Sequence, residues 1–281
     1  MTTEAARHTM TTIRILAVRD GRGRERTDAL VGEEPLEIRA SGPGQAPVRV
    51  AVTMRTPGND FELAAGFLIT EGLVEPDAIE AVAYCEDPDV QRYNVVTVRT
   101  RTPFDLGIAE RNFFATSSCG ICGKAALEAI TVRCAPLGPG LTIRADVLLA
   151  MPDVLRERQR VFDRTGGLHA AGLFDTDGRL RLLREDVGRH NAVDKAVGAV
   201  ALGAGSGGAV LLVSGRLSFE IVQKAAVARI SIICAISAPT NLAVQAAEDL
   251  GVTAVGFLRP DGFNIYAHPD RVQMVAGADG A

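Results

Sequence analysis

Two cysteines, Cys119 and Cys122, stand three positions apart in the segment SSCGICGK, at the predicted start of an apolar-faced helix. Backbone N–H groups and the helix dipole at such a position favour a thiolate over a thiol, and Lys124 adds a nearby positive charge. A thiolate is the nucleophile that attacks a sulfur donor, and a second cysteine within a turn can resolve the sulfur species on the first. The pair therefore predicts sulfur-transfer or redox chemistry.

Three other interpretations of this pair stay open on the residues alone. A dithiol oxidoreductase uses the same spacing, but normally after the first strand of a compact unit, whereas more than a hundred residues precede Cys119. A structural zinc site needs about four ligands. The chain has no second C-x-x-C, and His169, His190 and His268 lack ligand spacing to one another, so we predict no metal. The third alternative is a purely structural pair.

Composition narrows the class of protein. The net charge of −4 and pI near 5.7 argue against a protein-wide attraction to nucleic acid or anionic membranes. No stretch approaches the roughly 20 apolar residues of a membrane helix, and MTTEAARHTMTT lacks the apolar core of a secretory signal. The other cysteines, Cys85, Cys134 and Cys234, stand singly among apolar residues, which predicts buried, unreactive thiols. We expect a cytoplasmic protein with no nucleic-acid or membrane partner.

Three polar segments in the second half each follow a predicted strand and each contain an arginine: Arg189 in REDVGRHNAVDK, Arg216 in VSGRLS and Arg259 in GFLRPDGFN. In open α/β sheets, ligands bind beyond the carboxyl ends of the strands, where helix N–H groups also favour anions. These segments predict a phosphorylated ligand, although both common nucleotide fingerprints are missing. The alternative for REDVGRHNAVDK is a capped, solvated helix start, and for His169 a satisfied strand histidine.

The elements that position these residues fall into two lobes. Residues 1–12 are expected to be frayed and disordered. Residues 13–140 form an N-terminal α+β lobe with strands over 13–19, 35–40, 48–54 and 93–100, a loop over 21–28 and a helix over 61–72. The C-x-x-C segment belongs to this lobe, and LGPG marks a soft boundary near residue 140. The two lobes could also be one domain.

Residues 141–281 form the predicted C-terminal α/β cofactor-binding lobe. It begins with a helical segment over 145–162 that is interrupted near Pro152. A hairpin about Asp177-Gly178 follows, and then continuous apolar strands alternate with helices to a last strand over 263–268. This alternation indicates a largely parallel sheet covered by helices, and therefore the α/β class.

Several of these segments, in the same order, resemble the formate dehydrogenase accessory sulfurtransferases, the FdhD/NarQ family. They are TPGNDFELAAGFLITEGL, SSCGICGK, FDRTGGLHAAGLF, REDVGRHNAVDKAVG, LLVSGRLSFEIVQKA and GVTAVGFLRPDGFNIYAH, and the resemblance covers roughly residues 35 to 272. The resemblance implies a homodimeric, cytoplasmic sulfur carrier with a cytidine deaminase-like mixed sheet. Its partners would be a cysteine desulfurase and formate dehydrogenase, and its bound substrate the molybdenum cofactor (bis-molybdopterin guanine dinucleotide), for which GDP or a GMP-type nucleotide is an analogue.

The resemblance also implies roles for particular residues. Cys119 matches the family's persulfide cysteine and Cys122 the second of the pair. The family's cofactor-binding stretch matches Phe257, Leu258, Arg259, Pro260, Asp261 and Gly262. The zinc-deaminase signature is absent, because His169 is followed by Ala-Ala and no P-C-x-x-C occurs, so a fold relationship would not imply deamination. The functional alternative is a chaperone that binds the cofactor without moving sulfur.

Overall fold

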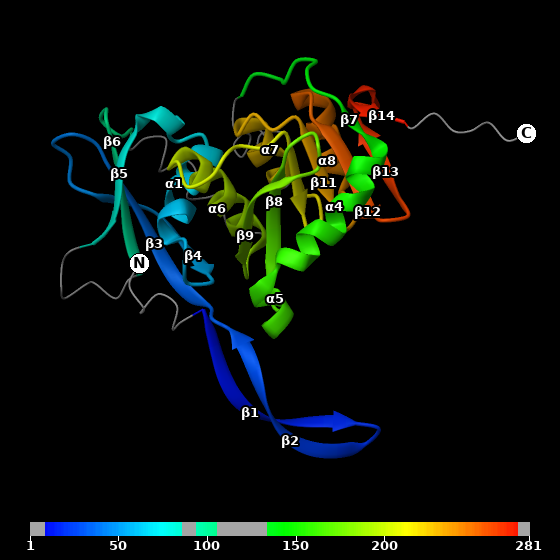
Figure 1. Ribbon diagram of the computed structural model, residues 1–281. Coiled ribbons are helices and arrows are strands. Elements are labelled where there is room, and N and C mark those ends of the chain that lie inside the picture. The colour runs from blue at the N-terminus through cyan, green and yellow to red at the C-terminus, as the bar shows by residue number, and fades with distance from the viewer. Residues whose placement is uncertain (1–8, 86–93, 106–133, 275–281) are drawn as a thin grey trace, which may run out of the picture.

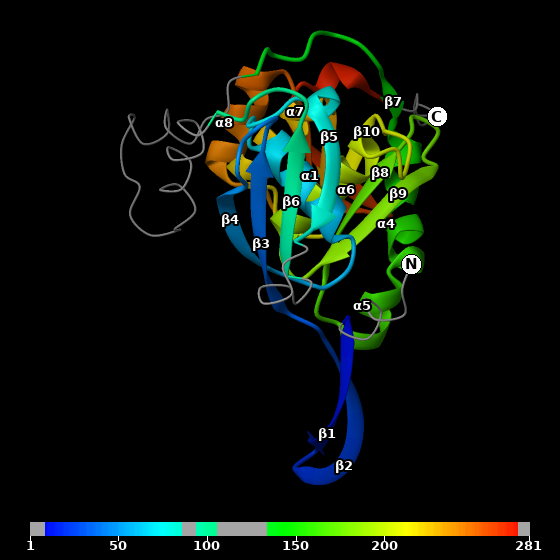
Figure 2. The ribbon, with the colours of Figure 1, turned by 90° about the vertical axis from the view of Figure 1, so that its left-hand side faces the viewer.

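The computed structural model describes residues 9–85, 94–105 and 134–274. Within these ranges two main sheets enclose a layer of helices, and a long two-stranded hairpin extends away from this body (Figure 1). A view turned by 90° shows the same separation of hairpin and body (Figure 2). The fold is therefore mixed α/β, with the smaller sheet formed by the N-terminal part of the chain.

The hairpin consists of β1 (Met10–Arg19) and β2 (Arg22–Val31), paired antiparallel over their whole length. Asp20 and Gly21 form its two-residue turn with φ of 50° and 73°, the left-handed geometry that matches the twist of paired strands. Two predictions are wrong here. The strand begins at Met10 rather than Ile13, and residues 21–28 form a strand rather than a loop, because pairing with β1 overrides their weak strand propensity.

The smaller sheet has the strand order β4-β3-β6-β5 and carries helix α1 (Asp60–Thr70) on its inner face. Its strands are β3 (Glu34–Ser41), β4 (Val48–Arg55), β5 (Ile79–Tyr84) and β6 (Val95–Thr100), with the short helix η1 (Pro76–Ala78) before β5. The predicted hairpin of β3 and β4 is confirmed by their antiparallel register. Alternate residues of β3, Leu36 and Ile38, are fully buried beneath α1.

The larger sheet has the order β13-β12-β11-β10-β8-β9. Its strands are β8 (His169–Phe174), β9 (Leu180–Asp186), β10 (Val210–Val213), β11 (Ile232–Ala235), β12 (Thr253–Arg259) and β13 (Gly262–Ala267). Only β10, β11 and β12 pair in parallel, so the expectation of a largely parallel sheet is wrong and the sheet is mixed. Short turns join β8 to β9 and β12 to β13, and such turns connect only antiparallel neighbours.

Helices cover both faces of the larger sheet. Helices α6 (Arg189–Ala201), α7 (Phe219–Val227) and α8 (Asn241–Leu250) pack on one face. On the other face lie α4 (Ala145–Arg158) and the small pair of β7 (Ile143–Arg144) with β14 (Val272–Gln273), which follows η2 (Pro269–Arg271). The predicted interruption at Pro152 is wrong: α4 continues through this buried proline, and the break comes at Gln159, before α5 (Arg160–Thr165).

Helices α1 and α6 join the two sheets through a close glycine contact. A Cβ built on Gly66 would lie 1.8 Å from the carbonyl oxygen of Asp194, and one on Gly198 would lie 1.8 Å from that of Glu62. Only glycine permits this separation of the helix axes. Residues from both sides of position 140 consequently share one buried apolar cluster. No helix in the described ranges is long and apolar enough to cross a membrane.

Candidate functional site

The carboxyl ends of β9, β10, β11 and β12 lie at one edge of the larger sheet. Strand β8 runs antiparallel to both β9 and β10, so those two strands share a direction, which β11 and β12 continue. Arg189 and Arg216 follow the ends of β9 and β10, and Arg259 closes β12. The fold thus brings all three sequence-predicted arginines to one edge.

His169, Arg189 and Gly215 meet at this edge. The Ala170 N–H donates to Ser214 Oγ at 2.9 Å, which fixes the start of β8 against the end of β10. A Cβ on Gly215 would lie 3.4 Å from His169 Nδ1 and 3.6 Å from Arg189 Cδ. Within the described part of the chain, Arg189 Nε is buried without a hydrogen-bond partner. A buried guanidinium N–H without a partner is suited to donating a hydrogen bond to an anionic ligand.

The electrostatics of His169 follow from this setting. Burial lowers its pKa below the usual 6.5, and the charges of Arg189 and His190 lower it further, while Asp186 opposes them. The imidazole is therefore neutral at neutral pH. A neutral imidazole has one ring nitrogen that can accept a hydrogen bond, and here it lies at the strand ends near Arg189.

The loops after β10 and β11 are tied to one another and lead into two helix N-termini. The Leu217 N–H donates to the carbonyl of Ala238 at 3.1 Å, and the Thr240 N–H donates to the carbonyl of Leu217 at 3.0 Å. Thr240 caps α8 through its side chain. Ser218 occupies the expected N-cap position of α7, but its hydroxyl contacts Glu220 at 3.3 Å rather than a helix N–H. These bonds fix the two loops relative to one another at this edge.

The predicted cofactor-binding stretch forms the end of β12 and its turn into β13. The side chain of Phe257 is exposed, and its backbone has the left-handed conformation with φ of 53°. The Phe257 N–H donates to the carbonyl of Ser237 at 3.2 Å. Leu258 is fully buried in the core, so only its backbone can face a ligand. Arg259 donates to the carbonyl oxygens of Ile236 and Leu258, Pro260 and Asp261 form the exposed turn, and Gly262 begins β13.

Most charged residues of REDVGRHNAVDK serve the fold instead of a ligand. Asp186 pairs with Lys195 at 2.6 Å, and both are almost completely inaccessible. Asp194 pairs with Lys224 at 2.9 Å, and Arg184 pairs with Glu62. Sequence reasoning missed these pairs, since no local signal shows that the partners converge. The sequence also did not indicate Thr56, whose carbonyl accepts from Lys195 at 2.8 Å.

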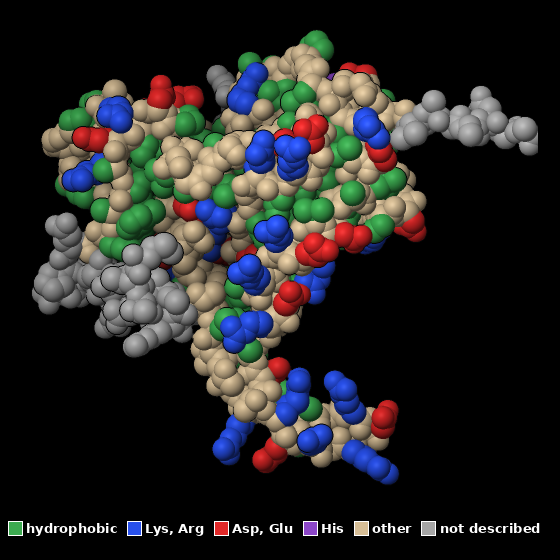
Figure 3. Space-filling view, viewed as in Figure 1, with side chains coloured by type: hydrophobic (Ala, Val, Ile, Leu, Met, Phe, Trp, Pro, Cys, Tyr) green, Lys and Arg blue, Asp and Glu red, His purple; other side chains and the backbone are tan. Residues whose placement is uncertain are grey.

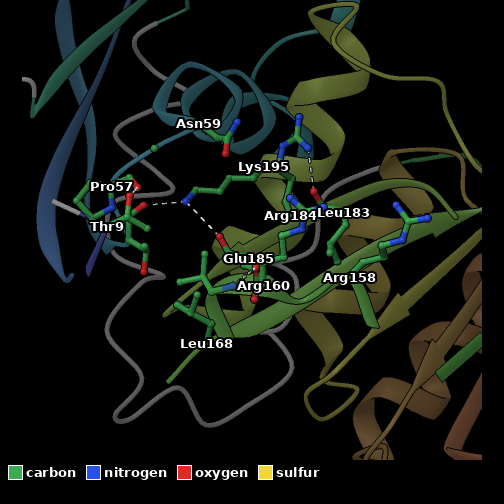
Figure 4. A pocket seen from close by; sticks show the side chains of 13 residues that line it. Thr9, Pro57, Asn59, Arg158, Arg160, Leu168, Leu183, Arg184, Glu185 and Lys195 are labelled. Atoms are coloured by element: carbon green, nitrogen blue, oxygen red, sulfur yellow. Dashed lines mark hydrogen bonds between the residues drawn. The ribbon is translucent and has the colours of Figure 1, made fainter. Parts of the chain in front are cut away.

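A cavity of about 300 Å³ lies beside β9, between the residues after β4 and the start of α5 (Figure 4). Lys195 reaches into it from α6 towards the backbone of Thr56 and Glu185. The Glu185 carboxylate accepts N–H bonds from Val161 and Phe162, yet burial outweighs them and raises the pKa of Glu185. The side chains of Arg158 and Arg160 line the same space.

A second cavity, of about 480 Å³, lies at the opposite end of the sheet, where β10 and β11 begin. Cys134 lines it together with Gly208 and Ile230. Burial raises the pKa of the Cys134 thiol, and Arg229 opposes the shift. This thiol is only partly buried, as is Cys85, whereas Cys234 is fully buried as predicted and its pKa is raised by burial.

The two cysteines predicted to carry the chemistry, Cys119 and Cys122, lie outside the described residues. Asp105 and Cys134 are the described residues on either side of them. Among the described side chains, no group of three or more His, Cys, Asp or Glu converges as a metal site. The geometry therefore defines the strand-end edge, with its arginines, His169 and Phe257, as the candidate ligand site.

Comparison with known proteins shows which family this chain resembles. The model of the FdhD/NarQ family matches residues 31–273. The sulfur carrier protein FdhD of Streptomyces avermitilis is 49% identical over 277 residues, 94% of this chain and 96% of that protein. That of Sulfurisphaera tokodaii is 44% identical over 92% of this chain and 98% of its own.

A solved structure shares the fold. The crystal structure of a candidate formate dehydrogenase accessory protein from Desulfotalea psychrophila superposes with a TM-score of 0.72 at 23% identity. The superposition covers 94% of this chain and all of that chain. The family match extends over most of the sequence, and it includes the cysteine pair and the whole strand-end edge. The chain belongs to the FdhD/NarQ family.

Proposed function

We propose that this protein is a sulfur carrier of the cytoplasm, which accepts sulfur as a persulfide on Cys119 and transfers it to the molybdenum cofactor used by formate dehydrogenase. The observation that carries this proposal is the near-full-length similarity to proteins named sulfur carriers, over a segment that includes Cys119 and Cys122. We further propose that the larger sheet is of the cytidine deaminase-like type and that the chain acts as a homodimer.

Loading and release can be written with atoms and electrons in balance. The Cys119 thiolate attacks the terminal sulfur of a desulfurase persulfide, an S–S bond forms on Cys119, and the desulfurase cysteine leaves as a thiolate. In release, the Cys122 thiolate attacks the Cys119 sulfur, and the terminal sulfur departs as sulfide towards the cofactor's molybdenum. The two electrons come from Cys122, and a cellular dithiol reopens the resulting disulfide.

The strand-end edge supplies the features that a guanine dinucleotide substrate requires. Arg189 presents a buried nitrogen that lacks a partner in the described structure, and Arg216 and Arg259 add positive charge for phosphates. The exposed ring of Phe257 offers an apolar surface for a base. A left-handed, exposed phenylalanine is costly for the backbone, and such residues concentrate at binding sites.

Chain length allows the thiols to meet this site. Fifteen residue steps separate Cys119 from Cys134, and a fully extended chain of that length spans at most ~50 Å. Cys134 lies at the amino end of the parallel strands, and the longest of these, β12 with 7 residues, is only ~23 Å long. The chain between Cys134 and Cys119 is therefore long enough to extend from the amino ends of the strands to their carboxyl ends.

Incubation with a cysteine desulfurase and cysteine, followed by mass spectrometry, tests the proposal. We expect an added sulfur on Cys119 of the wild type and of Cys85→Ala, the matched control, and none at this position in Cys119→Ala. Cys122→Ala should load sulfur but deliver it poorly. Equal labelling of Cys119→Ala would refute the carrier role. Full activation of formate dehydrogenase by a Cys119→Ala/Cys122→Ala variant would instead select a cofactor chaperone, and reduction of a model disulfide a dithiol oxidoreductase.

A further inference from the structure

The cavity of about 300 Å³ beside β9 lies next to the strand-end edge. Glu185, which lines it, is the last residue but one of β9, and Leu168, which also lines it, directly precedes His169. Glu185 and Leu168 lie on one side of the cavity, and Asn59 lies across from them (Figure 4). This volume is at the lower end of the range for small-molecule sites, so it suits one ring system and not a whole dinucleotide.

Glu185 supplies the only carboxylate among the described residues that line this cavity. Its Oε1 accepts the N–H of Phe162 at 3.0 Å and its Oε2 accepts that of Val161 at 3.3 Å, so both oxygens are held in place at the start of α5. Each carboxylate oxygen has two acceptor positions, and each therefore keeps one for a ligand. Glu185 forms no ion pair with a described residue, and burial raises its pKa. N–H donors of a ligand would satisfy such a fixed, half-buried carboxylate.

The two inner cations of the cavity wall are already paired within the protein. Lys195 pairs with Asp186 at 2.6 Å, and Arg184 pairs with Glu62. As far as the described residues form it, the interior therefore offers no unpaired cation, and Glu185 gives it the character of a hydrogen-bond acceptor. Such an interior disfavours a phosphate and favours an uncharged ring that carries N–H donors.

The mouth of the cavity has the opposite character. Arg158 and Arg160 line it, both are exposed, and neither side chain forms an ion pair or hydrogen bond with another described residue. Lys and Arg side chains gather on this part of the surface, beside α5 and above the hairpin of β1 and β2 (Figure 3). Arginines at the mouth can hold an anionic group that is joined to a ring inside. The cavity thus fits a ring with N–H donors that continues into an anionic group outside.

Guanine and pterin share one ring edge, that of 2-amino-4-oxopyrimidine, on which a ring N–H and an exocyclic amino group point the same way. These two donors match the two free acceptor positions of one carboxylate, as the paired N–H groups of an arginine do. We propose that the cavity binds a 2-amino-4-oxopyrimidine ring of the cofactor, with Glu185 accepting hydrogen bonds from both donors. This assignment rests on the proposed function, because the cofactor carries two pterins and two guanines.

The ring in this cavity differs from the base expected at Phe257. Phe257 lies on β12 and Glu185 lies on β9, and four strand spacings separate these strands in the sheet. At ~4.8 Å for each spacing, the two positions are ~19 Å apart across the sheet. One base cannot reach both, so Glu185 selects a second ring of the same large cofactor. A ring without the amino group would leave one acceptor position of the carboxylate unfilled, which makes Glu185 a specificity-determining residue.

Paired ligands test the ring without altering the protein. Fluorescence titration of the full chain compares pterin-6-carboxylate with lumazine-6-carboxylate, and calorimetry compares GDP with IDP; the second member of each pair lacks the amino group. The wild type should bind the pterin at least tenfold more tightly than the lumazine, since a site built around a donor rejects the analogue that lacks it. Glu185→Gln should bind both alike. The matched control Glu157→Gln, an exposed acid outside the cavity, should discriminate like the wild type.

A second variant places the ligand in this cavity even if Glu185→Gln does not fold. Arg158→Gln/Arg160→Gln changes two exposed side chains and should weaken the binding of both carboxylates about tenfold, because it removes the charge at the mouth. Binding of both carboxylates as in the wild type would contradict the proposed position.

The two ligand pairs also identify the source of the ring. Discrimination of the pterin that depends on Glu185 supports a pterin in the cavity. A second GDP site in each chain, absent with IDP and lost in Glu185→Gln, supports a guanine instead. Equal or undetectable binding of the two carboxylates, together with a single GDP site that Glu185→Gln leaves unchanged, would overturn the assignment. Persulfide loading of Cys119 needs no cofactor, so wild-type protein that loads sulfur without discriminating either pair refutes the cavity's role and leaves the carrier proposal standing.

Discussion

Lys195 Nζ lies 2.6 Å from Asp186 Oδ2, and this pair is sealed between the end of β9, the middle of α6 and the backbone after β4. The Thr56 N–H donates to the same carboxylate oxygen at 3.1 Å, and Lys195 donates to the Thr56 carbonyl. The pair therefore joins the smaller sheet to the larger one. It also holds α6, and with it Arg189, at the strand-end edge.

Replacement of Lys195 by methionine is expected to destabilise the protein by about 3–5 kcal/mol, because an unpaired carboxylate would remain buried at Asp186. Urea unfolding followed by circular dichroism measures the change. The double variant Lys195→Met/Asp186→Asn removes the charge as well and should recover part of the loss. Single and double variants of equal stability would show that the buried charge is not the cause.

The contact between α1 and α6 gives the second prediction. Gly198→Ala should lower the free energy of unfolding by about 3 kcal/mol, because the new methyl group would overlap the Glu62 carbonyl. Helix propensity alone predicts the opposite sign, a gain of about 1 kcal/mol. Gly140→Ala, where a Cβ meets nothing within 4 Å, is the matched control. A stabilised Gly198→Ala variant would contradict the observed helix spacing.

His169 makes stability depend on pH. Burial and the charges of Arg189 and His190 lower its folded pKa below 6.5, so the unfolded chain binds the proton more readily. The stability associated with the neutral imidazole is present above pH 6.5 and is lost as the pH falls through the folded pKa. Thermal unfolding from pH 7.5 to pH 5 should show a smaller loss for His169→Gln than for the wild type, with His268→Gln as control. Identical pH profiles would exclude this role.

Arg189 is expected to bind the phosphates of a guanine nucleotide. Arg189→Gln should weaken the binding of GDP about tenfold or more, since a charge-assisted hydrogen bond contributes about 1.5–3 kcal/mol. Isothermal titration calorimetry measures the affinity. Arg181→Gln, which removes an exposed arginine paired with Asp175, should leave it unchanged. If both variants bind GDP as the wild type does, the nucleotide lies elsewhere.

Local sequence patterns predicted a helix or strand correctly wherever the segment itself contains apolar periodicity or turn residues. The β3–β4 hairpin, α1 and the alternation of strands and helices after residue 209 follow from apolar periodicity and turn residues. The prediction was wrong for β2, whose polar residues form a strand only because β1 pairs with them. It was wrong at Pro152, because packing of α4 against the sheet outweighs the missing hydrogen bond.

The sequence by itself determined the class of the fold, the family and the three strand-end arginines, because these depend on residue types over short ranges. Only the tertiary structure decided which charged side chains are paired within the protein and which can bind a ligand. Asp186 and Asp194 are neutralised by Lys195 and Lys224, and Arg189 keeps a buried nitrogen without a partner in the described chain. Burial and the folding of separate elements against one another control these states, and no local pattern encodes them.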